Sequence, residues 1–155
     1  MSEDKKTIGN QEWCAFPWLG LPAIKARVDS GAKTSSIHAF NIDNFVKDAS
    51  EWVSFEVHPL QRNDEVLIRC ESQVIDLRNV KSSSGTSETR YVINTPISLG
   101  DKVWDIELTL TDRDAMGYRM LLGREAMNGR LIIDPSRQCL LAKISSKKAM
   151  QYYRS

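Results

Sequence analysis

An aspartate, a hydroxyl residue and a glycine follow one another at Asp29-Ser30-Gly31 and supply the parts of a hydrolytic site. Two carboxylates a few ångströms apart cannot both ionise cheaply, so they share one proton and can activate a water molecule against an amide carbonyl. The hydroxyl can hydrogen-bond across such a pair, and glycine permits the tight turn and close approach that the pair needs. The chain has one such turn, so we predict that a second copy supplies the second carboxylate.

The surroundings of this turn make it more specific than the tripeptide alone, because Asp-Ser-Gly is a common turn sequence. An apolar, strand-like segment, residues 23–28, leads into the turn, and the small residue Ala32 follows it. Much later in the chain, Leu121-Leu122-Gly123-Arg124 opens a short predicted helix that ends near Asn128-Gly129. The combination favours a catalytic turn over an ordinary surface turn.

Alternating apolar and polar residues dominate the chain and predict short strands. The clearest strand candidates are residues 53–57, 91–97, 104–110, 131–133 and 139–141. Residues 134–137, Asp-Pro-Ser-Arg, predict a turn between the last two. With a single short helix over residues 124–127, the pattern predicts a mostly β barrel or sandwich.

Length and composition fit one globular domain. The chain has 155 residues, of which 41% are hydrophobic and 26% charged, and its net charge of +1 argues against a general polyanion binder. It contains no apolar run long enough for a transmembrane helix, and its polar first residues do not resemble a signal peptide. We therefore expect a cytoplasmic protein with its domain at residues 7–145, and flexible or weakly ordered termini at residues 1–6 and 146–155.

Three stretches of the chain together resemble the retropepsin family. They are residues 26–39 around the Asp29 turn, residues 78–85 with 90–93, and residues 110–116 running into 120–124. They are most similar to a bacterial, RimB-like group of retropepsin-like proteins, also called ATP-dependent zinc proteases, whose members accompany the ATP-grasp glutamate ligase RimK. The resemblance covers roughly residues 9–141. Ser30 stands where this group more often has threonine, and it keeps the hydroxyl.

The resemblance implies a closed, retropepsin-like acid-protease β-barrel with one short helix and an active site at a two-fold homodimer interface. Asp29 of each chain would form the catalytic dyad, with Ser30 and Gly31 holding it. Gly123 and Arg124 would support the turn from below. The hairpin tip at residues 82–87 would act as a flap over the substrate.

The link to a glutamate ligase implies a glutamate-rich, poly-glutamate-tailed substrate. Lys33 follows the catalytic turn, and Arg78, Lys81 and Arg90 flank the flap tip, so these cations are candidates for binding carboxylates. The alternative that they are solvated charges on strand edges stays open. The expected substrate contacts are Ala32, Lys33, Thr34, Arg78, Lys81, Ser83, Ser84, Gly85 and Arg90.

The sequence predicts no metal and no other cofactor. It lacks a His-Glu-x-x-His helix, and its two histidines, His38 and His58, fall on separate segments. It also lacks a phosphate-binding loop, so any link to ATP belongs to a partner. Basic and aromatic residues do not interleave as they do in nucleic-acid-binding proteins.

The prediction is therefore a homodimeric aspartic peptidase that acts on a glutamate-rich protein or peptide. Two alternatives stay open. One is a non-catalytic dimeric module that binds glutamate tails or the partner ligase. The other is a zinc-dependent hydrolase with ligands drawn from Asp29, His38 and a cysteine.

Overall fold

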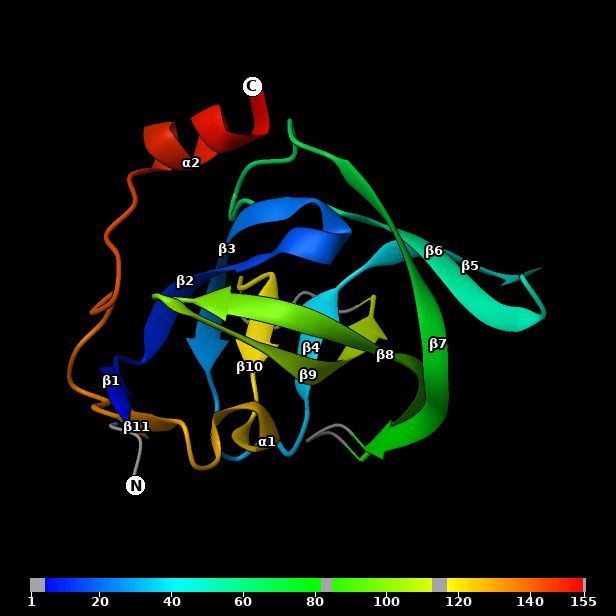
Figure 1. The fold of residues 1–155 in the computed structure, drawn as a ribbon, viewed down its shortest axis with the longest axis horizontal. Helices are drawn as coiled ribbons and strands as arrows, with labels where there is room; N and C mark the ends of the chain where they lie inside the picture. The colour runs from blue at the N-terminus through cyan, green and yellow to red at the C-terminus, as the bar shows by residue number, and fades with distance from the viewer. Residues whose placement is uncertain (1–4, 82–84, 113–116, 155) are drawn as a thin grey trace.

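Six strands close into a barrel in the computed structural model, which describes residues 5–81, 85–112 and 117–154 (Figure 1). Their order round the barrel is β2 (Gln11–Phe16), β3 (Leu21–Val28), β10 (Met120–Leu122), β4 (Ser35–His38), β9 (Lys102–Thr111) and β8 (Ser87–Leu99). Ala15 of β2 pairs with Ser98 of β8, and this pairing closes the ring. The predicted closed, mostly β fold is confirmed.

The remaining described strands lie outside this ring. From β8 the sheet continues in antiparallel order through β7 (Ile68–Lys81), β6 (Ser50–Val57) and β5 (Phe40–Lys47). A separate parallel pair joins β1 (Lys6–Ile8) to β11 (Leu131–Ile133). The alternation seen in the sequence matches burial, since Val53, Phe55 and Val57 of β6 are fully buried.

Apolar side chains from every barrel strand fill the interior. Phe16, Ile24, Ile37, Leu108 and Leu122 are all fully buried in one cluster. Burying a side chain of this size stabilises the fold by about 1.5–3 kcal/mol. The barrel therefore gives a rigid frame to the loops at its ends.

Two helices and one 3-10 turn, η1 (Pro17–Leu19), accompany the strands in the described residues. The predicted helix is present as α1 (Arg124–Met127). A second helix, α2 (Ser146–Arg154), forms in the segment for which the sequence analysis expected a weakly ordered tail. No helix in the described part of the chain is long and apolar enough to cross a membrane.

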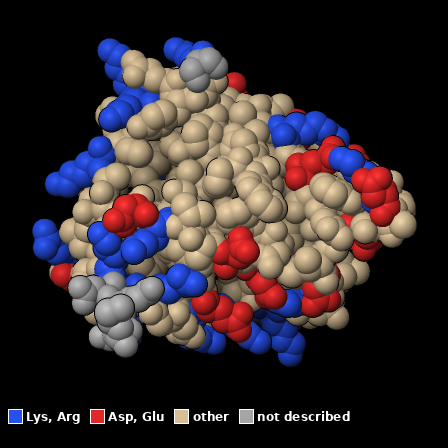
Figure 2. Space-filling model, viewed as in Figure 1, with Lys and Arg blue, Asp and Glu red and all other residues tan. Residues whose placement is uncertain are grey.

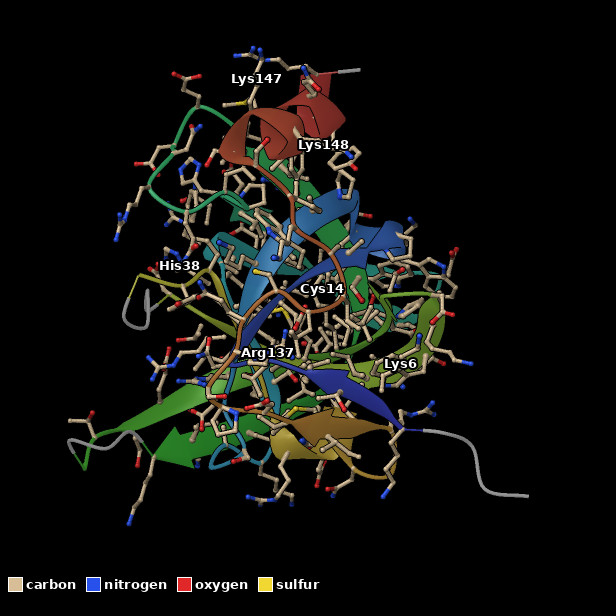
Figure 3. The ribbon with its side chains drawn as sticks, turned by 90° about the vertical axis from the view of Figure 1, so that its left-hand side faces the viewer. Lys6, Cys14, His38, Arg137, Lys147 and Lys148 are labelled. Carbon is tan, nitrogen blue, oxygen red and sulfur yellow. The ribbon has the colours of Figure 1, made fainter. Side chains whose placement is uncertain are left out.

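Helix α2 is held against β3 by a few contacts that the sequence pattern does not reveal. Ala149 is fully buried beside Ala23, and the Tyr153 hydroxyl accepts a hydrogen bond from the Ala23 N–H at 3.2 Å while donating to the Ala23 carbonyl. Burial raises the pKa of the Tyr153 hydroxyl. Lys147, by contrast, points away from the barrel (Figure 3).

The predicted strand at residues 139–141 is wrong. Cys139 has a φ of 52°, a left-handed conformation that interrupts an extended strand. The backbone N–H groups of Leu140 and Leu141 instead donate to the fully buried carboxylate of Glu12, at 2.8 and 3.1 Å. The same carboxylate accepts a third bond, 2.8 Å long, from the Gly9 N–H. One side chain thus ties residues 140–141 and the start of β2 together.

Replacing Glu12 with alanine is expected to destabilise the protein by about 2–5 kcal/mol, because three backbone N–H groups lose their acceptor inside the protein. Urea denaturation followed by fluorescence measures the change. The exposed Glu65, which lies 3.8 Å from Arg154, gives the control. Its alanine variant should lose no more than about 0.5 kcal/mol. Equal losses in the two variants would contradict this account of Glu12.

Candidate active site

Asp29 begins a tight turn directly after β3. Its N–H donates to the Leu122 carbonyl at 2.9 Å, and its own carbonyl accepts from the Ala32 N–H at 3.2 Å. The Gly31 N–H donates to Oδ1 of Asp29 at 3.0 Å, which fixes one carboxylate oxygen. The carboxylate is therefore oriented by backbone groups, while Ser30 and Gly31 beside it are exposed.

Strand β10 lies between β3 and β4 and brings a distant segment under this turn. It pairs in parallel with β3 and antiparallel with β4. Gly123 follows β10, and its N–H donates to the Ser35 hydroxyl at 2.9 Å. A Cβ atom at position 123 would lie only 2.6 Å from the carbonyl carbon of Thr34, so the backbones approach too closely for any side chain.

Helix α1 then holds the turn through its first N–H groups. The N–H of Arg124 donates to the Ala32 carbonyl at 2.7 Å, and the N–H of Glu125 donates to the Lys33 carbonyl at 3.0 Å. The Arg124 guanidinium donates from Nη1 to the Ser30 carbonyl at 3.1 Å. The first N–H groups of α1 therefore find their hydrogen-bond acceptors in the carbonyl groups of the turn.

The sequence analysis did not single out Ser35, although its side chain joins the turn to Gly123. Ser35 is almost fully buried, and its carbonyl also accepts a hydrogen bond from the Thr109 hydroxyl at 3.2 Å. A serine at the start of a strand gives no sequence signal for such a role. Its importance becomes visible only when β10 is known to lie beside β4.

The β7–β8 hairpin reaches the same end of the barrel as the Asp29 turn and α1 (Figure 1). Lys81 and Ser87 pair at the last described rung. Gly85 has a φ of 86°, a conformation that favours glycine. Ser83 and Ser84, two of the expected substrate contacts, lie outside the described residues. The flap role of this hairpin stays a prediction.

The predicted substrate-binding cations have acidic neighbours. Arg78 donates to Glu107 and to Asp76, each at 2.7 Å, and these bonds raise the pKa of its guanidinium and lower that of the Asp76 carboxyl. Arg90 donates to Glu88 at 3.1 Å.

Two lysines complete the predicted set. The exposed Lys33 lies 3.7 Å from Glu125, and Lys81 makes no ion pair within the described residues. Acidic and basic side chains also lie next to one another along the lower part of the face in Figure 2. Substrate carboxylates would have to compete with internal ones, and substrate binding by these cations stays a prediction.

His38 lies at the end of β4 that is farther from the Asp29 turn. Figure 3 shows it well away from the end of the barrel that carries α1. Its Nε2 is 3.5 Å from a carboxylate oxygen of Asp112, and its ring centroid is 6.0 Å from that of Phe40. Across the described ranges, no three His, Cys, Asp or Glu residues gather as metal ligands would.

Comparison with known proteins gives a family match over most of the chain. The model of a family described as RimB-like, a retropepsin-like aspartic endopeptidase RimB, matches residues 7–143. A solved structure of a protein with unknown function from Legionella pneumophila is similar, with a TM-score of 0.74 and 28% identity. That match covers 89% of this chain and 99% of the other.

Curated relatives are longer proteins, and they are named as ligases, whereas the matching family is described as an endopeptidase. A probable alpha-L-glutamate ligase of Desulfotalea psychrophila is 64% identical over 155 residues, which is 99% of this chain and 33% of the relative. A protein of the same name from Shewanella pealeana is 58% identical over 153 residues, again 99% of this chain and 33% of the relative. The chain thus spans about a third of the length of these relatives.

Replacing Gly123 with alanine is expected to cost about 2–4 kcal/mol of stability, because the new Cβ meets the backbone of Thr34 rather than a movable side chain. Gly129 is the matched control. Its φ of 76° strains an alanine, but no atom lies within 4 Å of the added Cβ, so its variant should lose about 1–2 kcal/mol. Denaturation of the two variants measures both losses. A smaller loss at Gly123 than at Gly129 would contradict the close approach.

Proposed function

The chain belongs to the RimB-like family of retropepsin-like aspartic endopeptidases, and we propose that it is itself an aspartic peptidase with Asp29 as its catalytic residue. The observation that carries this proposal is the way Asp29 is held. Its N–H bonds to Leu122, its carboxylate bonds to Gly31, and Arg124 bonds to the neighbouring Ser30 carbonyl. A carboxylate fixed by backbone groups at a partly exposed turn is suited to orient a water molecule.

The proposed reaction needs two carboxylates, and each chain supplies one. Two Asp29 side chains, one from each copy, would share a proton across a two-fold axis. The ionised member removes a proton from water, whose oxygen attacks the amide carbonyl. The protonated member stabilises the developing oxyanion. The carbon–nitrogen bond then breaks, giving a carboxylic acid and an amine that takes up the transferred proton.

A surface suitable for pairing two copies lies near the active-site end of the barrel. In Figure 1 the β1–β11 pair lies at the same end as α1. Ile132 of β11 is 51% exposed, although it lies in the middle of its strand. We propose that the dimer forms through this end of the barrel.

For the substrate, we propose a glutamate-rich chain, such as a protein or peptide with a poly-glutamate tail. The support is the name of the relatives, probable alpha-L-glutamate ligase, since they carry a segment very similar to this chain. Lys81 is the cation of the hairpin best placed to meet a carboxylate, because it has no ion pair within the described residues. Arg78 and Arg90 would bind a substrate carboxylate only by releasing the acidic side chains that they contact within the chain.

A second candidate function is a non-catalytic dimeric module that binds glutamate tails or the ligase. It is favoured by the relatives, in which a similar segment occupies about a third of a protein named as a ligase. It keeps the same fold and the same hairpin. It differs in requiring no chemistry from Asp29.

The test is cleavage of a glutamate-tailed peptide by the wild-type protein and by Asp29→Asn, followed by mass spectrometry. The asparagine cannot share or accept the proton, so the variant should lose activity by about 10²–10⁴-fold or more. It should still bind the peptide. A peptide with a glutamine tail tests whether the carboxylates are needed, and a chelator tests for metal dependence.

The outcomes separate the candidates. Shortening by the wild type alone, unaffected by the chelator, supports the aspartic peptidase. Equal cleavage by Asp29→Asn would rule out the proposed catalytic role. Binding of the peptide by both proteins without any shortening would favour the non-catalytic module.

A further inference from the structure

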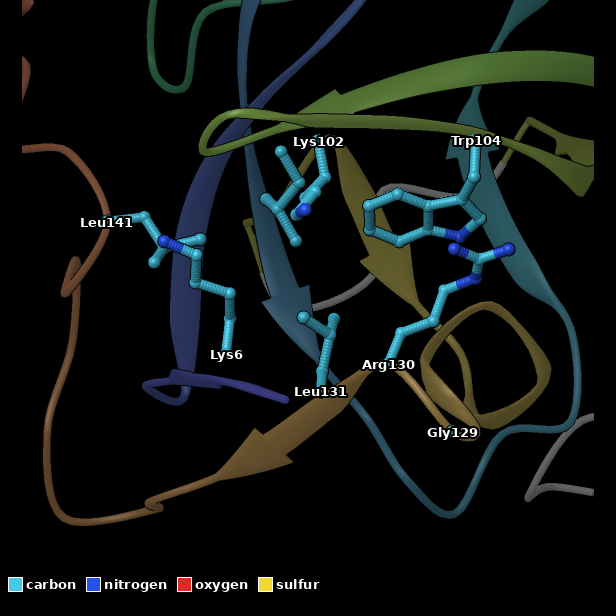
Figure 4. A pocket seen from close by; sticks show the side chains of 8 residues that line it. Lys6, Lys102, Trp104, Gly129, Arg130, Leu131 and Leu141 are labelled. Carbon is cyan, nitrogen blue, oxygen red and sulfur yellow. The ribbon is translucent and has the colours of Figure 1, made fainter. Parts of the chain in front are cut away.

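A small pocket lies beside the C-terminal end of α1 (Figure 4), and Asp29 is not among the residues that line it. It has a volume of about 40 Å³ and is formed by three separate parts of the chain: β1, the end of β8 with the start of β9, and the segment that follows α1. Leu141, whose backbone N–H donates to the Glu12 carboxylate, also lines the pocket. A volume of this size holds about three water molecules, or a group of similar bulk such as an isobutyl group.

The apolar wall of the pocket is already fixed in place. The indole of Trp104 donates from Nε1 to the Ala126 carbonyl at 3.0 Å, which ties the ring to the end of α1. Trp104 is only 9% exposed and Leu99 only 3%. Leu131 and Leu141 add two further aliphatic side chains. A small apolar group entering this space would therefore meet a preformed surface.

The rim of the pocket is cationic. Lys6, Lys102 and Arg130 line it, and no aspartate or glutamate does. Lys6 lies 3.6 Å from Asp101, which is not among the lining residues.

Two of these cations, Lys102 and Arg130, make no ion pair within the described residues, unlike Arg78 and Arg90 of the β7–β8 hairpin. Arg130 instead lies over the Trp104 ring, with its guanidinium carbon 5.1 Å from the ring centroid. In Figure 4 the ammonium of Lys102 points into the space between the lining side chains. Neighbouring cations without counterions favour an anion, and a carboxylate can bond to both an ammonium and a guanidinium.

We propose that this pocket binds a carboxylate carried on a small apolar body. The carboxylate lies between Lys102 and Arg130, and the apolar group packs on Trp104 and Leu99. A free branched-chain acid has this chemistry, and so does the C-terminus of a peptide that ends in leucine. The site does not involve Asp29, but two of its lining residues, Lys6 and Leu131, belong to the β1–β11 pair at the end of the barrel proposed above for the dimer.

The test is titration of the ¹⁵N-labelled protein with 4-methylpentanoate, followed by the indole N–H signal of Trp104 and the backbone signals of residues 129–131. These signals should shift together and saturate. The neutral isostere 4-methylpentanamide should bind roughly fivefold to tenfold more weakly, because it lacks charge-assisted hydrogen bonds. Acetate, which lacks the apolar body, should also bind more weakly. Equal binding of acid and amide would overturn the proposal.

A second arm distinguishes the two sources of the carboxylate. The peptide acetyl-Gly-Gly-Leu is titrated as its free acid and as its C-terminal amide. Tighter binding of the free peptide than of 4-methylpentanoate assigns the pocket to chain ends, and the reverse order assigns it to small acids. Saturable binding of neither carboxylate would overturn the proposal.

Variants locate the binding in this pocket. Lys102→Gln and Arg130→Gln should each weaken binding of the acid severalfold while leaving binding of the amide unchanged. Lys148→Gln, which removes an exposed cation on α2, is the matched control and should bind like the wild type. Similar weakening in all three variants would show a general charge effect and would contradict the site.

Discussion

The structure of the site depends on the close fit of one short strand, β10, between β3 and β4. This placement gives the Asp29 N–H its acceptor at Leu122 and sets Gly123 against the backbone of Thr34. From there α1 can direct its first N–H groups at the turn. Each hydrogen bond contributes only about 0.5–1.5 kcal/mol, but they share one geometry, so a change in the position of β10 would affect them all. The orientation of the Asp29 carboxylate is thus a property of the barrel as a whole.

Charge is distributed differently at the β7–β8 hairpin and at the pocket beside α1. In the hairpin, Arg78 and Arg90 occupy opposite positions on neighbouring strands, where two like charges would repel. Glu107, Asp76 and Glu88 remove that repulsion. At the pocket, Lys102 and Arg130 have no such partner among the described residues, so an anion from outside is the group that would neutralise them. Attraction of carboxylates to this molecule therefore need not be confined to the region around Asp29.

Sequence patterns predicted the elements whose signals are local. Alternation identified the segments that form β6, β8 and β9, and the family resemblance led to the closed barrel. The failures involve contacts between distant residues. Residues 139–141 have the composition of a strand, but the Glu12 carboxylate binds their N–H groups in another conformation. Helix α2 packs on β3 through hydrogen bonds between Tyr153 and Ala23, and Ser35 acts through the neighbouring β10; a local sequence pattern reveals neither contact.

The central claim is that two chains share one catalytic dyad, and a mixing experiment tests it most directly. A fixed amount of wild-type protein is incubated with increasing amounts of Asp29→Asn until subunits have exchanged, and cleavage of the glutamate-tailed peptide is measured. A shared dyad predicts that activity falls to about half when the two proteins are equal in amount and continues toward zero with excess variant, because mixed dimers hold only one aspartate. Activity that stays constant at every ratio would show that each chain works alone and would contradict the account.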